Sequence, residues 1–331
     1  MLSFYFSLST QHSALSTYLI MLIVEIHATS HIGRVRRGNE DNYLLLQIAD
    51  SQTWTSSQDP SDFIIESQQF EVDASGVILA VSDGMGGALA GEVASKMAVE
   101  TISEKILNED PESTVSPHGT GDSLIARLYE ATIYANHLIH REQRSNPEYS
   151  GMGATFTGIG VTREAVDIVQ VGDSRAYLIR NAKIYQITKD QSLVQQLIDA
   201  QQIQPEEAET HALKNVILQA LGAQNEIYPV PARLYPQRDD ILLLCSDGLS
   251  NKLRGEDMLR IVMENVDQLQ MATALLVKEA NERGGEDNIT VILAKLTGSD
   301  LTEPTEEDVK LEIVNFNDIH DTADQDTAEI V

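Results

Sequence analysis

The sequence predicts a mixed α+β protein, with strands gathered in one or two sheets and helices that each turn one apolar face to the core. Short apolar runs rich in β-branched residues, such as 77–81, 166–171 and 289–293, are typical of strands. Apolar residues three or four positions apart in 90–106 and 124–138 are typical of amphipathic helices. Because large β-rich folds often exceed 200 residues, we expect one domain at 21–298 with extensions at both ends.

The first twenty residues carry no lysine or arginine, so they lack the positive start of an ordinary secretory signal. The apolar run 18–24 is far shorter than the roughly 20 residues needed to cross a bilayer. Met21 begins the first predicted strand (MLIVEIHATS). Residues 1–20 are therefore interpreted as a disordered extension or a wrongly assigned start.

Residues 34–46 (RVRRGNEDNYLLL) place three arginines before an acidic pair and a strand. Arg36 stands four residues before Glu40, so it can reach the same strand end and bind an anion there. A basic cluster on solvated surface is the plainer alternative. The polar, Ser/Gln/Asp-rich segment 48–76 is predicted to be a long surface loop or hairpin insertion.

The stretch 77–108 is the centre of the sequence pattern and predicts a strand, a turn and a helix. Asp83 ends the strand, and three glycines, Gly84, Gly86 and Gly87, permit a tight turn with positive φ. An isolated Asp-Gly pair usually does no more than cap a turn. The helix that follows presents the small and apolar stripe Ala90, Ala94, Ala98, Ile102, Ile106.

The second half of the chain predicts a strand meander, an irregular subdomain and a closing α/β segment. The subdomain, residues 189–237, is rich in short polar segments and prolines and is expected to lie outside the sheets. The remaining predicted elements are strands at 154–161, 166–171, 175–180, 183–188, 241–246 and 289–296, and helices at 256–265 and 270–283.

Charge and cysteine content exclude several classes of protein. A formal net charge of −28 argues against nucleic-acid binding, which needs a basic face. Cys245 is the only cysteine and lies in an apolar strand, so it cannot form a disulfide within the chain and fits a reducing cytoplasm. Residues 301–331 hold ten acidic residues against Lys310, which predicts a disordered acidic tail over 299–331.

Carboxylates recur at the ends of the predicted strands. If the strands share one or two sheets, several of these acids converge on one edge, where like charges oppose one another's ionisation. A hard divalent cation relieves that conflict, and oxygen-only ligands suit Mg²⁺ or Mn²⁺. The carboxylates at strand ends are Glu40, Asp41, Asp83, Asp173, Asp247 and Asp287.

Six segments in order over residues 22–296 resemble the motif series of bacterial metal-dependent (type 2C, PPM) serine/threonine protein phosphatases. The resemblance implies a four-layer α-β-β-α sandwich, two antiparallel sheets flanked by helices, with a small flap subdomain at 189–237. The six segments are RGNEDN (37–42), VSDGMGGALAGEVAS (81–95), GMGATFTGIGV (151–161), VGDSRAYLIR (171–180), LLCSDGLSNKL (243–253) and EDNITVILAKL (286–296).

The resemblance also implies a centre of two Mn²⁺ or Mg²⁺ ions, with a third, weaker ion in bacterial members. The substrate would be phosphoserine or phosphothreonine in a protein, attacked by a metal-activated bridging water. The implied roles are Asp83 as the ligand of both metals, the Gly84 carbonyl as a ligand of one, Asp247 and Asp287 as ligands of the other, Glu40 and Asp41 as holders of metal-bound waters, Arg36 as the phosphate ligand and Asp173 as a ligand of the third ion.

The implied partners are phosphorylated proteins and an opposing serine/threonine kinase, with the enzyme a monomer that binds neither membrane nor nucleic acid. Two alternatives stay open. A catalytically weak phosphoprotein-binding scaffold would share the fold. A nucleotide-binding enzyme has only lone GxG pairs, 151–153 and 158–160, and no GxxxxGK[ST] motif.

Four positions depart from the family pattern. Met85 stands where animal members often have a histidine, so no general-acid role is implied there. Gln191 stands where bacterial members usually have histidine, and Leu218 and Gln219 stand where they usually have threonine and arginine. The last three lie in or beside 189–237, so they concern substrate recognition and leave the implied metal ligands intact.

Overall fold

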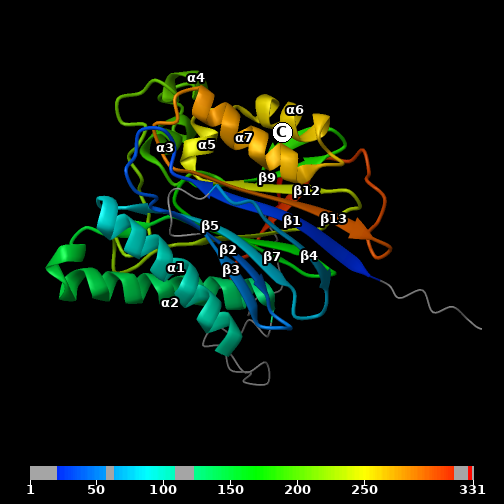
Figure 1. The fold of residues 1–331 in the computed structure, drawn as a ribbon, viewed down its shortest axis with the longest axis horizontal. Coiled ribbons are helices and arrows are strands. Elements are labelled where there is room, and N and C mark those ends of the chain that lie inside the picture. The colour runs from blue at the N-terminus through cyan, green and yellow to red at the C-terminus, as the bar shows by residue number, and fades with distance from the viewer. Residues whose placement is uncertain (1–20, 57–62, 109–122, 317–326, 330–331) are drawn as a thin grey trace, which may run out of the picture.

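The computed structural model describes residues 21–56, 63–108, 123–316 and 327–329. Two antiparallel sheets lie face to face, with α1 (Ala88–Asn108) and α2 (Leu124–Ser145) on one outer side and α6 (Gly255–Glu264) and α7 (Leu269–Glu282) on the other (Figure 1). The predicted four-layer α-β-β-α sandwich is confirmed. The extension at residues 1–20 lies outside the described residues.

The first sheet is built around the pairing of β1 with β13. Leu22 pairs with Gly298 at one end and His31 with Ile289 at the other, so two segments from opposite ends of the chain lie side by side. The strand order of this sheet is β10 (Lys183–Gln186), β9 (Arg175–Arg180), β12 (Ile241–Cys245), β13 (Ile289–Gly298), β1 (Leu22–His31), β4 (Glu66–Val72).

The second sheet has β5 near its middle and carries the glycine-rich turn. Its order is β15 (Thr327–Glu329), β14 (Lys310–Ile313), β11 (Val230–Leu234), β8 (Val166–Val171), β7 (Phe156–Val161), β5 (Val77–Met85), β2 (Asp41–Gln47), β3 (Gln52–Thr55), and the short β6 (Gly153–Ala154) pairs with the end of β5.

Side-chain alternation explains the layers. On β5, Val77, Leu79 and Val81 point into the core between the sheets, while Ile78 and Ala80 point to the helices α1 and α2. A strand buried on both faces has no polar face, which is why 77–81 reads as a continuous apolar run. The predicted stripe of α1 is confirmed, because all five of its residues are buried against this sheet.

Segment 48–76 was predicted to be a long surface loop or a hairpin insertion, and the hairpin alternative is correct for its first part. Its first part forms β3, which pairs with β2, and its last part forms β4, which pairs with β1. The two strands lie on different sheets, and Trp54 and Phe70 meet between them with ring centroids 5.3 Å apart. The segment therefore closes one edge of the sandwich by crossing from one sheet to the other.

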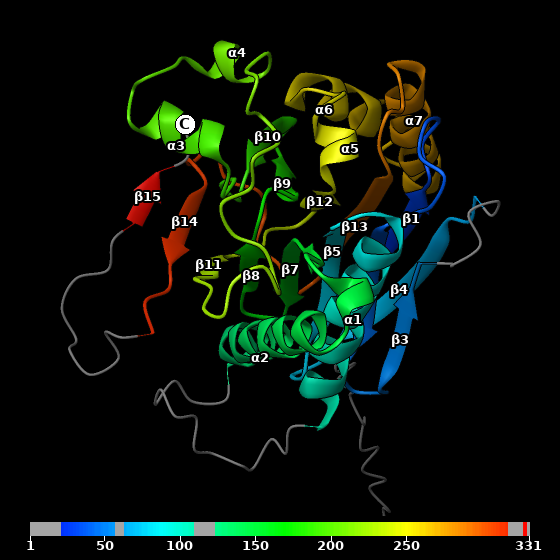
Figure 2. The same cartoon turned by 90° about the vertical axis from the view of Figure 1, so that its left-hand side faces the viewer.

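The expectation of a disordered tail over 299–331 is wrong for residues 299–316. β14 lies beside β11 (Figure 2) and pairs with it. Val314 donates a backbone hydrogen bond to the carbonyl of Pro231 at 3.0 Å. Leu301, Val309 and Leu311 are buried in the core between the sheets. The segment is rich in charged residues, but its few apolar residues pack into the core between the sheets and hold it there.

The subdomain at 189–237 is partly as expected. It contains α3 (Leu193–Asp199) and the single turn α4 (Pro205–Ala208), both outside the sheets. Its last part is β11, which belongs to the second sheet and pairs with β8. Among the described residues, no helix is long and apolar enough to span a membrane.

Candidate metal centre

Strand pairing brings the predicted acids to one end of the sandwich. Asp83, at the end of β5, is the register partner of Asp41, the first residue of β2. Asp247 follows β12 and begins the short helix α5 (Asp247–Ser250), while Asp287 stands just before β13, the neighbour of β12. Asp173 lies in the turn between β8 and β9.

Two glycines let the acidic strand ends approach each other. Gly84 donates a backbone hydrogen bond to the carbonyl of Glu40 at 3.1 Å, and a Cβ at Gly84 would lie 2.0 Å from the carbonyl oxygen of Gly91. A Cβ at Gly91 would in turn lie 2.0 Å from Oε2 of Glu40. The glycines of α1 and of the turn therefore make room for the Glu40 carboxylate.

Hydroxyl and amide groups fix the acids in place. Oδ2 of Asp41 accepts hydrogen bonds from Ser246 at 2.6 Å and from Thr290 at 2.7 Å. Oδ1 of Asn288 accepts a hydrogen bond from the backbone N–H of Glu40 at 2.8 Å. Ser246, Asn288 and Thr290 were not among the predicted site residues, although the first two adjoin Asp247 and Asp287 in the same motifs.

Burial and mutual repulsion raise the pKa values of four carboxyl groups. Burial is the largest cause in each case. It raises the pKa of Asp41 and of Asp173 to about 7 and that of Asp247 to about 6. The pKa of Asp83 is raised well above its usual value, by burial and then by the negative charge of Asp41. These groups resist being charged together, as expected for a site completed by a cation.

Arg36 lies at the rim of this cluster. Its Nη2 donates a hydrogen bond to Oδ2 of Asp287 at 2.7 Å, and its Nη1 lies 3.6 Å from Oε1 of Glu40. The Arg36 side chain is 45% exposed and that of Asp287 is 35% exposed. An ion pair this exposed contributes little to stability, so the guanidinium is free to exchange Asp287 for another anion.

The unsatisfied oxygens of the cluster fit a cation. As carboxylates, Asp173 and Asp247 each present a buried Oδ1 that no donor among the described residues contacts. Such an atom is rare in a folded protein, and a bound cation would satisfy it. No three acidic, histidine or cysteine side chains in the described ranges converge closely enough to enclose one ion. A hard cation would therefore need main-chain or water oxygens as well, as Mg²⁺ usually does.

The two unusual glutamines bind one backbone group. Gln191 and Gln219 each donate a side-chain hydrogen bond to the carbonyl of Tyr228, at 3.2 and 3.4 Å. Gln191 also accepts from the backbone N–H of Gly172, directly before Asp173, at 2.8 Å. The two glutamines therefore connect the turn that carries Asp173 to the segment before β11 through side-chain hydrogen bonds.

The raised pKa values predict that the free energy of unfolding of the metal-free protein decreases as the pH rises. A carboxyl whose folded pKa exceeds its unfolded value stabilises the fold below the unfolded pKa, and this contribution is lost as the pH rises through the folded pKa. In EDTA we expect the free energy of unfolding to fall by about 2 kcal/mol between pH 5.5 and 8, because each pKa unit is worth about 1.4 kcal/mol. Denaturant unfolding at both pH values measures this. A rise in stability over that range would contradict the assignment.

Gly91→Ala is expected to displace the Glu40 carboxylate. Alanine favours a helix by about 1 kcal/mol over glycine, so the helix should be retained while turnover falls about tenfold or more. Gly38→Ala is the matched control, since a Cβ there meets nothing within 4 Å. Melting temperature and kcat of both variants test this. Equal kcat for the two would show that Glu40 tolerates the added methyl group.

Known proteins resemble the chain in sequence and structure. Residues 57–279 match the protein phosphatase 2C family. The serine/threonine phosphatase stp of Listeria monocytogenes is 34% identical over 272 residues, which cover 82% of this chain and 94% of that protein. The serine/threonine protein phosphatase PstP of Mycobacterium tuberculosis is 35% identical over 223 residues, 67% of this chain and 41% of that protein.

The crystal structure of the Mycobacterium tuberculosis phosphatase PstP superposes with a TM-score of 0.65 and 31% identity, covering 83% of this chain and 99% of that one. The fold, the acidic end and these similarities all indicate one family of proteins. The chain belongs to the protein phosphatase 2C family.

Proposed function

We propose that the chain removes phosphate from phosphoserine and phosphothreonine residues of proteins in a metal-dependent reaction. The observation that carries this proposal is the convergence of Asp41, Asp83 and Asp247 on one end of the sandwich, with Arg36 beside them. The chain spans only 41% of the length of the Mycobacterium tuberculosis relative, so the proposal concerns the domain that this sequence contains.

The proposed cofactors are two Mn²⁺ or Mg²⁺ ions. A related structure, the catalytic domain of PstP, is described in complex with two manganese ions. In this chain Asp83 would contact both ions, the Gly84 carbonyl would contact one, and Asp247 and Asp287 would contact the other, after side-chain rotations that bring these three acids closer together. Asp173, whose buried Oδ1 faces no donor among the described residues, would hold a third, weaker ion.

When bound, two such ions lower the pKa of a water that they share and neutralise the charge of the transferring phosphoryl group. The protein's own residues contribute by positioning the substrate phosphate and water. Arg36 exchanges Asp287 for the substrate phosphate, with which a guanidinium forms paired hydrogen bonds. Glu40 and Asp41 orient water at the site, and the hydroxyls of Ser246 and Thr290 hold the Asp41 carboxylate still.

The proposed partners are phosphorylated proteins and a serine/threonine kinase with the opposite activity. A monomeric enzyme, no binding to nucleic acid or membranes, and a location in the cytoplasm stay predictions from the sequence. The packing of Leu301, Val309 and Leu311 supports a catalytic domain that extends from residue 21 to about 316, beyond the expected end at 298.

The test is turnover of p-nitrophenyl phosphate and of a phosphothreonine peptide by purified protein, with and without Mn²⁺. We expect turnover of both that EDTA abolishes and Mn²⁺ restores. Arg36→Ala should raise KM for the peptide, since phosphate binding is lost. Binding of the phosphopeptide without any metal-dependent turnover would support the scaffold alternative and refute the enzymatic proposal.

A further inference from the structure

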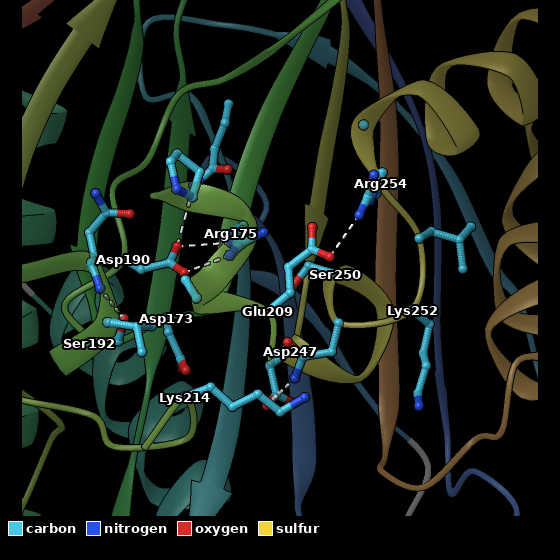
Figure 3. Close-up of a pocket in the computed structure, with 18 of the residues that line it drawn as sticks. Asp173, Arg175, Asp190, Ser192, Glu209, Lys214, Asp247, Ser250, Lys252 and Arg254 are labelled. Atoms are coloured by element: carbon cyan, nitrogen blue, oxygen red, sulfur yellow. Dashed lines mark hydrogen bonds and ion pairs between the residues drawn. The ribbon is translucent and has the colours of Figure 1, made fainter. Parts of the chain in front are cut away.

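A large groove opens directly beside Asp173 and Asp247. It has a volume of about 910 Å³ and runs between the subdomain helices α3 and α4 on one side and α5 and the start of α6 on the other (Figure 3). Its walls include apolar side chains from both sides. These are Val194, Ile198, Pro205 and Ala208 from the subdomain, and Ile184 and Leu253 from the body.

Most charged groups in the groove are neutralised by the protein itself. Arg175 forms two hydrogen bonds to Asp190, at 2.9 and 2.7 Å, and Arg283 donates to Asp257 at 2.6 Å. These pairs line the groove, but their charges are already paired and are not available to a ligand. An anionic ligand would have to bind other cations.

Lys214 is such a cation. Its side chain lines the groove from the subdomain and, among the described residues, has no carboxylate within ion-pair distance. Lys214 shares the lining of the groove with Asp247 and Lys252 of the body (Figure 3). The ammonium of Lys214 therefore faces the body across the groove rather than open solvent alone.

Arg254 is a second cation that a ligand could recruit. It donates a hydrogen bond to Oε2 of Glu209 at 2.7 Å, which joins the start of α6 to the subdomain. Both side chains are more than half exposed, at 73% and 55%. Because exposed pairs of this kind are worth at most about 1 kcal/mol, a ligand carboxylate could displace Glu209 without a large penalty.

We infer that this groove binds the peptide flank of the phosphorylated substrate and selects flanks that carry an acidic residue. The inference rests on the proposed phosphatase function and extends it to the substrate class. Lys214 binds the acidic side chain, and Arg254 turns to it from Glu209. In a chain of net charge −28, a local pair of available cations decides which acidic sequences can approach.

The experiment compares phosphothreonine peptides that are identical except for Glu, Gln or Lys within four positions on either side of the phosphothreonine. The readout is the ratio of kcat/KM between Glu and Gln peptides, which cancels differences in active enzyme concentration. We expect wild-type protein to favour at least one Glu peptide about fivefold, and 0.5 M salt to reduce this ratio. A ratio near one for every position would overturn the inference.

Lys214→Glu should reduce the ratio to one or invert it. The matched control is Lys278→Glu, which makes the same charge change on α7 at a side chain that is 65% exposed and does not line the groove. If both variants change the ratio equally, overall charge is responsible and the groove is not. Glu209→Gln should increase the ratio, because it frees Arg254.

Hydrolysis of p-nitrophenyl phosphate by wild-type protein distinguishes failure of the groove assignment from failure of the proposed function. Metal-dependent hydrolysis of this small substrate together with no preference among the peptides would overturn the groove assignment alone. No hydrolysis of any substrate would instead overturn the proposed function.

Discussion

Asp83→Asn is expected to lower kcat at least several hundredfold at every Mn²⁺ concentration. Asp83 ends the central strand β5, pairs with Asp41, and lies within reach of the charges of Asp173, Asp247 and Asp287. If it contacts both ions, an amide in its place weakens both sites together, and excess metal cannot compensate. Isothermal titration with Mn²⁺ should show loss of both tight sites. Unchanged tight binding in this variant would refute the bridging role.

Asp173→Asn is the matched substitution, since it removes the same formal charge from a buried acid in the same cluster. Asp173 lies in the turn between β8 and β9 and would serve only an outer, weaker ion. We expect near-normal tight binding of Mn²⁺ and a loss of turnover seen mainly in kcat. A role limited to surface electrostatics would instead give small and equal effects for the two variants.

Deletion of residues 301–331 is expected to destabilise the protein by about 3 kcal/mol, because each fully buried aliphatic side chain contributes about 1.5–3 kcal/mol before the entropy of ordering the segment is subtracted. The deletion removes Leu301, Val309 and Leu311 from the core between the sheets and exposes the edge of β11. For a domain of this size the melting temperature should fall about 8 °C.

The double variant Glu306→Gln, Glu307→Gln is the control for charge, since both side chains are exposed. Its melting temperature should stay within about 1 °C of wild type, in line with ordinary surface substitutions. Well below the melting temperature, the deletion should leave kcat on a small substrate within about twofold. A melting temperature that the deletion does not change would show that β14 adds nothing to the fold.

The best-buried elements were predictable from the sequence. Strand β5 was predictable because burial on both faces demands a continuous apolar run. Helix α1 was predictable because its buried face demands apolar residues at a fixed period. Strand β4, at the edge of the first sheet, and strand β14, between β15 and β11, were not predictable in this way. Only Phe70 and Val72 of β4 are buried, and β14 sits in an acidic segment, so composition hides strands that depend on pairing with a neighbour.

The acids of the site were predictable because they stand at strand ends. The residues that hold these acids in place by hydrogen bonds were not predictable. Ser246 and Thr290 reach Asp41 only through the register of β12, β13 and β2, which one sequence does not reveal. Lys214 and Arg254 are likewise unremarkable in sequence, and only the fold places them on the two walls of one groove.

The pairing of β1 with β13 also limits how the chain can be assembled during synthesis. Both strands lie inside the first sheet, yet their paired residues Leu22 and Gly298 are nearly a whole domain apart in sequence. Until residue 298 has left the ribosome, β1 can pair only with the edge strand β4. Contacts of such long sequence separation slow folding, so one edge of the apolar strand β1 stays unpaired during most of the translation of the domain.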